Sequence, residues 1–100
     1  MNIPELEVFL AVAAERSFSK AAHRLHRTQS AVSQSLRRLE DELGERLVDR
    51  SRKDGRLTEA GRVLQDYADR LLRLADEAGT AVRELADLQR GRVLVGANDG

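Results

Sequence analysis

The sequence predicts a mainly α-helical fold, with three short helices, a small β-hairpin and then one long helix. Two patterns indicate this arrangement. Apolar residues recur every three or four positions over most of the 100 residues, and the longest interruption, residues 45–58, contains an Asp-Gly turn signal at Asp54 and Gly55. With three aromatic residues and no cysteine, the core has to be aliphatic and without disulfides.

The first helix is predicted over residues 4–15. Pro4 suits the first turn of a helix, where the N–H that proline lacks has no intrahelical partner. The apolar residues that follow are spaced i, i+3, i+4, i+7 and are Leu6, Phe9, Leu10 and Ala13. This spacing predicts an amphipathic helix with one buried face.

A short second helix is predicted next, with Ser19 as its N-cap because a serine hydroxyl can accept a hydrogen bond from an unpaired backbone N–H. The apolar residues of this helix are Ala21, Ala22 and Leu25. Residues 26–28 are the predicted turn, and Thr28 is the predicted N-cap of a third helix.

The third helix is predicted over residues 29–43 and ends before Gly44, which favours the left-handed conformation of a helix C-cap. Its apolar residues form one stripe: Val32, Leu36, Leu39 and Leu43. The acidic residues from Glu40 to Glu45 are interpreted as a solvated face. Two short arms around the Asp-Gly turn then predict a β-hairpin within residues 45–58.

The second half of the chain is predicted to be one long helix, residues 59–90, capped by Thr58. Its apolar residues repeat with 4, 3 spacing and are Ala60, Leu64, Tyr67, Leu71, Leu74, Ala78, Ala81, Leu85 and Leu88. A helix about 45 Å long cannot bury so narrow a stripe alone, so we expect a partner helix, parallel or antiparallel. After Gly91, residues 92–96 ("RVLVG") predict a strand. The expected units are therefore 1–58, 59–90 and 91–100, the last being the start of a further domain.

The layout of residues 1–58 is that of a winged helix-turn-helix, whose second paired helix enters the major groove of DNA. About 140° from the apolar stripe, the third helix carries Ser30, Ser33, Gln34 and Arg37. Hydroxyl, amide and guanidinium groups can hydrogen-bond base edges or phosphates, so this face is predicted to contact DNA. The N–H groups near Thr28, Gln29 and Ser30 are predicted to bind a phosphate.

The charge distribution suits a polyanionic partner. The net charge is 0, yet residues 16–56 contain eleven Lys and Arg against six Asp and Glu, a local charge of +5. Four cations of the hairpin are predicted to contact flanking phosphates or the minor groove: Arg50, Arg52, Lys53 and Arg56. One of these can instead pair with Asp49 or Asp54, and charge alone leaves a solvated surface as the alternative.

Two segments carry a resemblance to a known family: "FLAVAAERSFSKAAHRLHRTQSAVSQSLRRLEDELGERLVDR", residues 9–50, and "RLTEAG", residues 56–61. The sequence resembles the LysR-type transcriptional regulators. The resemblance implies a domain that reads double-stranded DNA, a linker helix that forms an antiparallel homodimer, a tetramer in the full-length protein, and a C-terminal domain with a small-molecule effector. It also implies groove contacts at Thr28, Gln29, Ser30, Ser33, Gln34 and Arg37, and wing contacts at Arg50 and Arg52.

Other function classes lack support in the sequence. His23 and His26 are three residues apart, but no further ligand stands near them in a metal-binding pattern, and there is no catalytic or cofactor signature in residues 1–100. No apolar run approaches the roughly 18 residues of a membrane span, so a cytoplasmic location is expected. The alternative function is a coiled-coil interaction module whose winged helix docks protein, which would not show the steep salt dependence of DNA binding.

Overall fold

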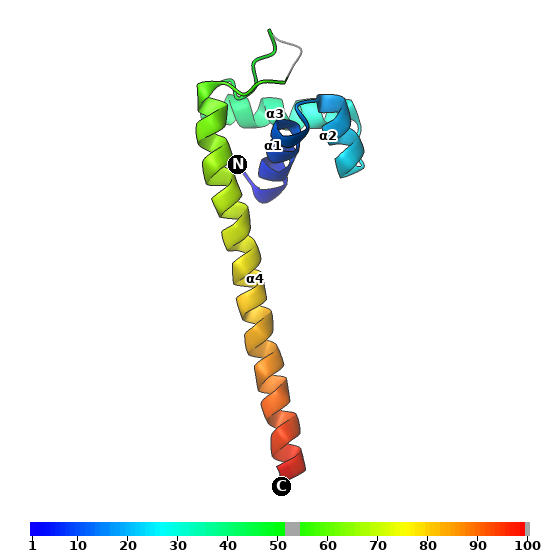
Figure 1. The fold of residues 1–100 in the computed structure, drawn as a ribbon, viewed down its shortest axis with the longest axis vertical. Helices are drawn as coiled ribbons and strands as arrows, with labels where there is room; N and C mark the ends of the chain where they lie inside the picture. The colour runs from blue at the N-terminus through cyan, green and yellow to red at the C-terminus, as the bar shows by residue number, and fades with distance from the viewer. Residues whose placement is uncertain (52–54, 100) are drawn as a thin grey trace.

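The computed structural model describes residues 1–51 and 55–99 and contains four helices in that part of the chain: α1 (Ile3–Glu15), α2 (Phe18–Leu25), α3 (Gln29–Leu43) and α4 (Glu59–Asp99). Figure 1 shows α1, α2 and α3 gathered into a small body from which α4 projects as a long rod. The principal extents are 70 × 25 × 19 Å, so the molecule is strongly elongated. No described helix is both apolar enough and long enough to cross a membrane.

Local capping signals determine where α1 and α2 begin. The Asn2 side chain accepts a hydrogen bond from the Glu5 N–H (2.9 Å), and the Glu5 carboxylate accepts one from the Asn2 N–H (3.2 Å), which forms a capping box. The prediction that Ser19 caps α2 was wrong. Ser17 has the extended backbone of an N-cap and accepts from the Lys20 N–H at 3.1 Å, so Ser19 lies inside the first turn.

The prediction for α3 is confirmed at both ends. The Thr28 hydroxyl accepts from the Ala31 N–H at 3.0 Å, and Gly44 closes the helix with a left-handed φ of 72°. The turn between α2 and α3 is residues 26–28, as expected. One member of the predicted stripe differs, since Leu43 in the last turn is 40% exposed.

The core lies among α1, α2 and α3 and is aliphatic apart from one aromatic ring. Its fully buried side chains include Phe9, Val12, Val32, Leu36 and Leu39, each 0% exposed. Leu47 and Val48 close it from the connection after α3, and the start of α4 packs against it through the half-buried Ala60 and Leu64. Burial of these apolar surfaces is the main force that holds the three helices together.

The first turn of α4 is held tightly against the connection. The Thr58 hydroxyl accepts from the Gly61 N–H at 3.0 Å and donates to the Arg46 carbonyl at 2.6 Å, which confirms Thr58 as the cap. A Cβ on Gly61 would lie 2.1 Å from the Leu47 carbonyl oxygen. Only glycine permits this approach of the helix to the backbone of Leu47.

At its other end α4 departs from the prediction. The sequence predicts a helix that ends at Gly91 and a strand over residues 92–96, whereas α4 continues to Asp99. A lone strand leaves its backbone N–H and C=O groups without partners, while a continued helix pairs them within the segment. The expected strand was therefore wrong for this structure.

The wing, residues 48–57, is also less regular than predicted. In place of a two-stranded hairpin, the described residues form a single antiparallel bridge between Val48 and Leu57, with the Asp49 N–H donating to the Arg56 carbonyl at 2.8 Å. Leu47 and Val48 donate their N–H groups to Glu40, a side chain of α3. Arg52, Lys53 and Asp54 lie outside the described residues.

Candidate nucleic-acid interface

The helix α3 presents two chemically distinct faces. Val32, Leu36 and Leu39 are completely buried and anchor the helix to the core. The opposite side carries the predicted contact residues, of which Ser33 is half-buried and the others are exposed: Gln29, Ser30, Gln34 and Arg37. Short polar side chains beside a long basic one let a helix backbone approach base edges, so this face can enter a major groove.

The N-terminal end of α3 adds a site for an anion. Thr28 is exposed and its hydroxyl caps the helix, which leaves other N–H groups of the first turn, near Gln29 and Ser30, directed outward. These groups carry partial positive charge and are a suitable place for a phosphate. The structure therefore brings six predicted residues together on one side of α3 and at its N-cap: Thr28, Gln29, Ser30, Ser33, Gln34 and Arg37.

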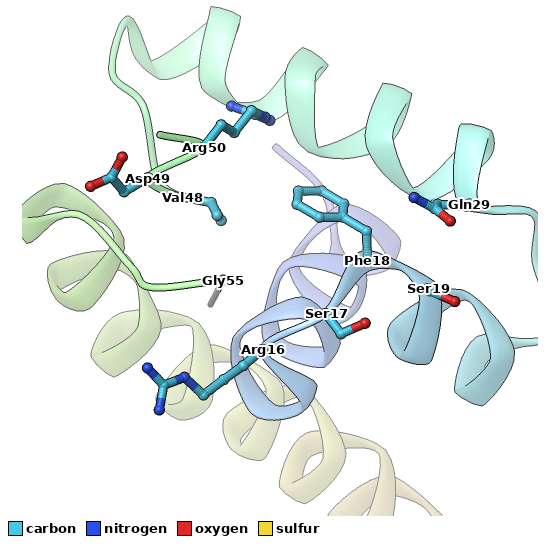
Figure 2. A pocket seen from close by; sticks show the side chains of 9 residues that line it. All are labelled: Arg16, Ser17, Phe18, Ser19, Gln29, Val48, Asp49, Arg50 and Gly55. Carbon is cyan, nitrogen blue, oxygen red and sulfur yellow. The ribbon is translucent and has the colours of Figure 1, made fainter. Parts of the chain in front are cut away.

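Two concave surfaces flank this face of α3. One lies between α3 and the wing and is lined by three arginines, Arg37, Arg46 and Arg50. The other lies where the first turns of α2 and α3 face the wing, and Figure 2 shows Ser17, Phe18 and Gln29 around it together with Arg50. Both surfaces join the recognition face to the wing, so a polyanion on α3 would also meet the wing.

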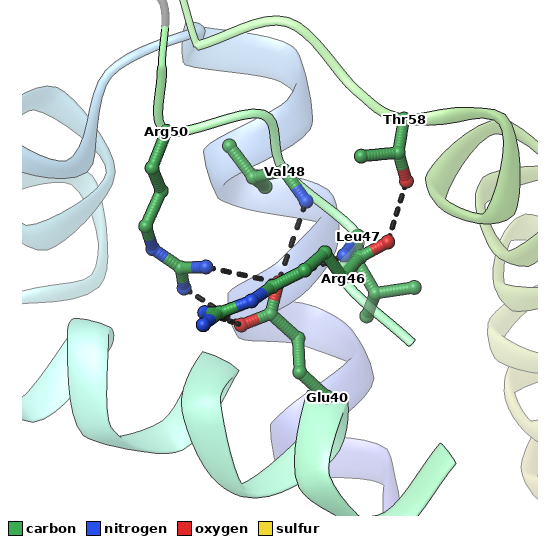
Figure 3. Close-up of polar contacts among 6 residues, drawn as sticks. All are labelled: Glu40, Arg46, Leu47, Val48, Arg50 and Thr58. Carbon is green, nitrogen blue, oxygen red and sulfur yellow. Dashed lines mark hydrogen bonds and ion pairs between the residues drawn. The ribbon is translucent and has the colours of Figure 1, made fainter. Parts of the chain in front are cut away.

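The wing is tied to α3 by a buried carboxylate. Glu40 is 3% exposed, and its Oε2 accepts hydrogen bonds from the N–H of Leu47 (2.8 Å) and of Val48 (3.5 Å). Arg50 adds a fork, with Nη2 2.8 Å from Oε1 and Nη1 3.1 Å from Oε2 (Figure 3). The interpretation of Glu40 as part of a solvated face was therefore wrong.

The electrostatics of Glu40 follow from these partners. Burial by itself raises the pKa of the carboxyl group, because it disfavours the charged form. The hydrogen bonds from Arg50, Leu47 and Val48 and the positive charge of Arg50 outweigh burial, and the pKa is lowered from its usual value of 4.5. Glu40 is consequently an anion at neutral pH, and it lies beneath a basic surface.

The predicted wing cations have different surroundings. Arg50 pairs with Glu40, and its guanidinium also lies 5.8 Å from the centre of the Phe18 ring, so it is not the free surface cation that the sequence suggested. The sequence allowed a wing cation to pair with Asp49 or Asp54 instead, whereas Arg50 pairs with Glu40. Arg56 is exposed at the bridge, while Arg52 and Lys53 lie outside the described residues.

The predicted dimerisation residues divide into two groups. Ala60 and Leu64 are half-buried against the core of their own chain. The remainder are exposed along the rod and are here named the apolar stripe of α4: Tyr67, Leu71, Leu74, Ala78, Ala81, Leu85 and Leu88. The N-terminal end of the stripe, at Tyr67 and Leu71, borders a groove that is also lined by Met1, Leu43 and Val63. So many exposed apolar side chains on one helix indicate a surface that binds another apolar surface.

A comparison with family models decides the identity of the fold. Residues 3–62, which include α1, α2, α3, the wing and the start of α4, match the model described as "Bacterial regulatory helix-turn-helix protein, lysR family". The chain belongs to the LysR family. The LysR match covers more than half of the chain and includes the whole face of α3 described above.

Solved LysR structures share this fold over most of the chain. The complex of the BenM DNA-binding domain with catB site 1 DNA is 34% identical, with a TM-score of 0.84 over 86% of this chain and 97% of that one. The CbnR DNA-binding domain in complex with DNA is 36% identical, with a TM-score of 0.82 over 86% of this chain and 99% of that one. DarR of Vibrio fischeri, also in complex with DNA, is 34% identical, with a TM-score of 0.84 over 88% of this chain and 30% of that one.

LysR relatives with longer chains are similar throughout these residues. A "Probable RuBisCO transcriptional regulator" of Cyanidioschyzon merolae is 42% identical over 97 residues, which are 97% of this chain and 32% of the relative. A protein of the same description from Synechocystis is 38% identical over 97 residues, 97% of this chain and 28% of the relative. The chain thus spans about a third of the length of the relatives it matches.

Two residues of this LysR chain were missed as parts of the interface. Arg46 lines the groove beside Arg37, and its side chain is 69% exposed. Glu40 lies four residues after Leu36, on the buried side of α3. A charged residue at an apolar-face position is the sequence signal for a buried ion pair, and that signal was available.

Proposed function

We propose that this chain is the DNA-binding and dimer-forming part of a LysR-type transcriptional regulator, with α3 in the major groove of double-stranded DNA. The observation that carries the proposal is the outer face of α3, where Gln29, Ser30, Gln34 and Arg37 are exposed opposite a completely buried apolar stripe. Gln can pair with adenine, Arg with guanine or phosphate, and Ser with several bases. The similar DNA-binding domains of BenM and CbnR are each in complex with DNA, which supports the same partner.

The wing and its surroundings would contact the DNA flanking the groove. The concave surface between α3 and the wing has Arg37 and Arg46 on its walls, and residues 16–56 have a local charge of +5. Basic side chains beside a recognition helix neutralise phosphates and release counterions. We propose Arg56, Arg52 and Lys53 as further contacts to backbone or minor groove, as the sequence predicts.

The apolar stripe of α4 would pair two copies of the chain. Leu74, Leu85 and Leu88 are 62%, 57% and 57% exposed, a state that costs free energy in water unless another surface covers them. Two copies would read two half-sites related by a dyad, which one recognition helix alone cannot specify. We propose an antiparallel homodimer, and a tetramer in a full-length protein.

The remaining functions would belong to a longer chain. The relatives are about three times as long as this chain. We propose that a C-terminal effector-binding domain follows and that a small-molecule effector binds there, while residues 1–100 act in DNA binding and not in catalysis.

Selection of bound sequences from a random DNA pool, followed by titration at several salt concentrations, tests the proposal. We expect enrichment of a dyad-related site and an affinity for it that falls steeply with salt, with several counterions released per subunit. Recovery of no common sequence, together with affinity that does not change with salt, would reject DNA recognition and favour a protein-docking module.

A further inference from the structure

The wing is held from two sides, and both contacts lie within this chain. On one side, Glu40 of α3 accepts hydrogen bonds from Leu47, Val48 and Arg50. On the other side, Gly55 has a left-handed φ of 63°, and a Cβ at this position would lie 2.5 Å from the Arg16 carbonyl oxygen. The base of the wing is therefore clamped between α3 and the turn that joins α1 to α2.

Arg50 is the link between the wing and α3. Its side chain is 29% exposed, and its two terminal nitrogens are directed to the two oxygens of Glu40 (Figure 3). Arg37 differs, since it is exposed and makes no hydrogen bond or ion pair with the residues that the structure describes. Of these two cations beside the same groove, Arg37 is available to a phosphate, and Arg50 is already neutralised by an internal anion.

We propose that Glu40 is a positioning residue for DNA binding, which acts through Arg50 and the N–H groups of Leu47 and Val48 to hold the wing against α3. This inference rests on the proposed function, because it requires that the wing contacts DNA. It also reassigns Arg50, from a wing cation that binds phosphate to an internal partner that holds the wing.

The direction in which DNA affinity changes when Glu40 is neutralised separates a positioning role from a purely electrostatic one. Glu40 is an anion beneath a basic surface, so its neutralisation alone would make the local potential more positive and strengthen binding to a polyanion. Release of the wing would instead weaken binding, because contacts to flanking DNA would then have to be ordered at an entropic cost. We expect the second effect to be the larger.

The test is DNA binding by Glu40→Gln, with the selected site of the wild-type protein. Gln accepts hydrogen bonds from backbone N–H groups but lacks the charge that holds the Arg50 fork. We expect roughly tenfold weaker binding at matched salt, comparable to the loss of one good contact. Hydroxyl-radical footprinting should show that protection is lost in the DNA flanking the recognition groove and retained within that groove. Equal or tighter binding by Glu40→Gln would overturn the proposal.

A second variant keeps the test decisive if Glu40→Gln is unstable. Arg50→Lys preserves the charge but replaces a two-point fork with a single ammonium. If Arg50 contacted a phosphate directly, lysine would substitute and affinity would be retained, which contradicts our assignment. We expect Arg50→Lys to weaken binding, and the double variant to bind no more weakly than Glu40→Gln, because both act through one link.

Two controls complete the design. Val12→Ala removes buried methyl groups from the core and leaves the Glu40–Arg50 pair unchanged, and it should bind as the wild type does if the protein is folded at the assay temperature. Arg37→Ala should weaken binding additively with Glu40→Gln, since it removes a separate contact. Wild-type binding without salt dependence would reject the proposed function itself, whereas salt-dependent wild-type binding with an unaffected Glu40→Gln rejects only the role of Glu40.

Discussion

The guanidinium of Arg50 meets the carboxylate of Glu40 at both oxygens, 2.8 Å from Oε1 and 3.1 Å from Oε2, and so joins the wing to the recognition helix. The same carboxylate also receives two backbone N–H groups from the segment between them. This buried anion keeps its hydrogen bonds at Oε2 and its ion pair at Oε1 only while the wing keeps its place. One ionised side chain therefore holds the wing to α3 on this side.

Acid should destabilise the fold through Glu40. Its pKa is lowered from 4.5 in the folded chain, so its contribution to stability is complete above about pH 4.5 and is lost as the pH falls through the folded value. In urea unfolding at neutral pH, the free energy of unfolding of Glu40→Gln should be about 1–3 kcal/mol lower than that of the wild type. Below pH 4.5, the free energy of unfolding should fall less with pH for Glu40→Gln than for the wild type. Glu84→Gln, an exposed change on α4, should keep the wild-type profile. Parallel profiles for Glu40→Gln and wild type would contradict the prediction.

Gln34 and Arg37 should have different roles on DNA. If Gln34 contacts a base, Gln34→Ala should cost about 1–3 kcal/mol of binding free energy and relax the preference at one position of the site. If Arg37 contacts a phosphate, Arg37→Ala should weaken all sequences alike and make the slope of log affinity against log salt less steep by about 1. Affinity measured for the selected site and its single-base variants at several salt concentrations separates the two. Wild-type binding by both variants would show that this face of α3 is not the contact surface.

The parts of the fold that the sequence predicts well are those with local causes. Thr28 and Gly44 bound α3 correctly because a cap hydroxyl and a left-handed glycine act within one turn of the helix. The prediction of Ser19 as the N-cap of α2 failed because Ser17, two residues earlier, has a hydroxyl within reach of the same first turn. Which of them has the extended backbone depends on how α1 ends, at Arg16 in a left-handed conformation.

Long-range contacts account for the rest. Among the described residues the two arms of the wing meet at one bridge only, and the N–H groups of Leu47 and Val48 bond Glu40, a partner that strand and turn patterns do not reveal. Leu43 belongs to the stripe of α3 by spacing, but the core ends before it and leaves it at the groove near Tyr67. The outer face of α3 follows from local helical spacing and could be predicted as a set. The pairing of Arg50 with Glu40 is a long-range contact and could not.

The apolar stripe of α4 should be required for dimerisation. Leu85 is 57% exposed, and Leu85→Asp would place a charge within a surface that has to be desolvated on pairing. Thr80→Asp is the matched control, since Thr80 is exposed on the same helix about 130° from the centre of the stripe. Sedimentation equilibrium at tens of micromolar should find a dimer for the wild type and Thr80→Asp, and a monomer for Leu85→Asp. A monomeric wild type would contradict the proposed pairing.

Gly61 and Gly79 lie on the same helix and should respond to alanine with opposite signs. At Gly61 the new Cβ would lie 2.1 Å from the Leu47 carbonyl oxygen and 3.2 Å from the Leu57 Cβ. Leu47 cannot easily move away, since its N–H is bonded to Glu40 and its carbonyl accepts from the Thr58 N–H at 3.0 Å. Gly61→Ala should therefore lower the free energy of unfolding by about 1–3 kcal/mol, the cost of overpacking.

At Gly79 the nearest atom to a new Cβ is Nη1 of Arg83 at 3.2 Å, the far end of a flexible side chain that can rotate away. Alanine favours the helix over glycine by up to about 1 kcal/mol, so Gly79→Ala should stabilise the protein. Urea denaturation of both variants, monitored by circular dichroism at one protein concentration, measures the two signs. Stabilisation by Gly61→Ala would mean that the first turn of α4 is not held against Leu47, and destabilisation by Gly79→Ala would indicate a second helix packed at that position, as a dimer contact there would require.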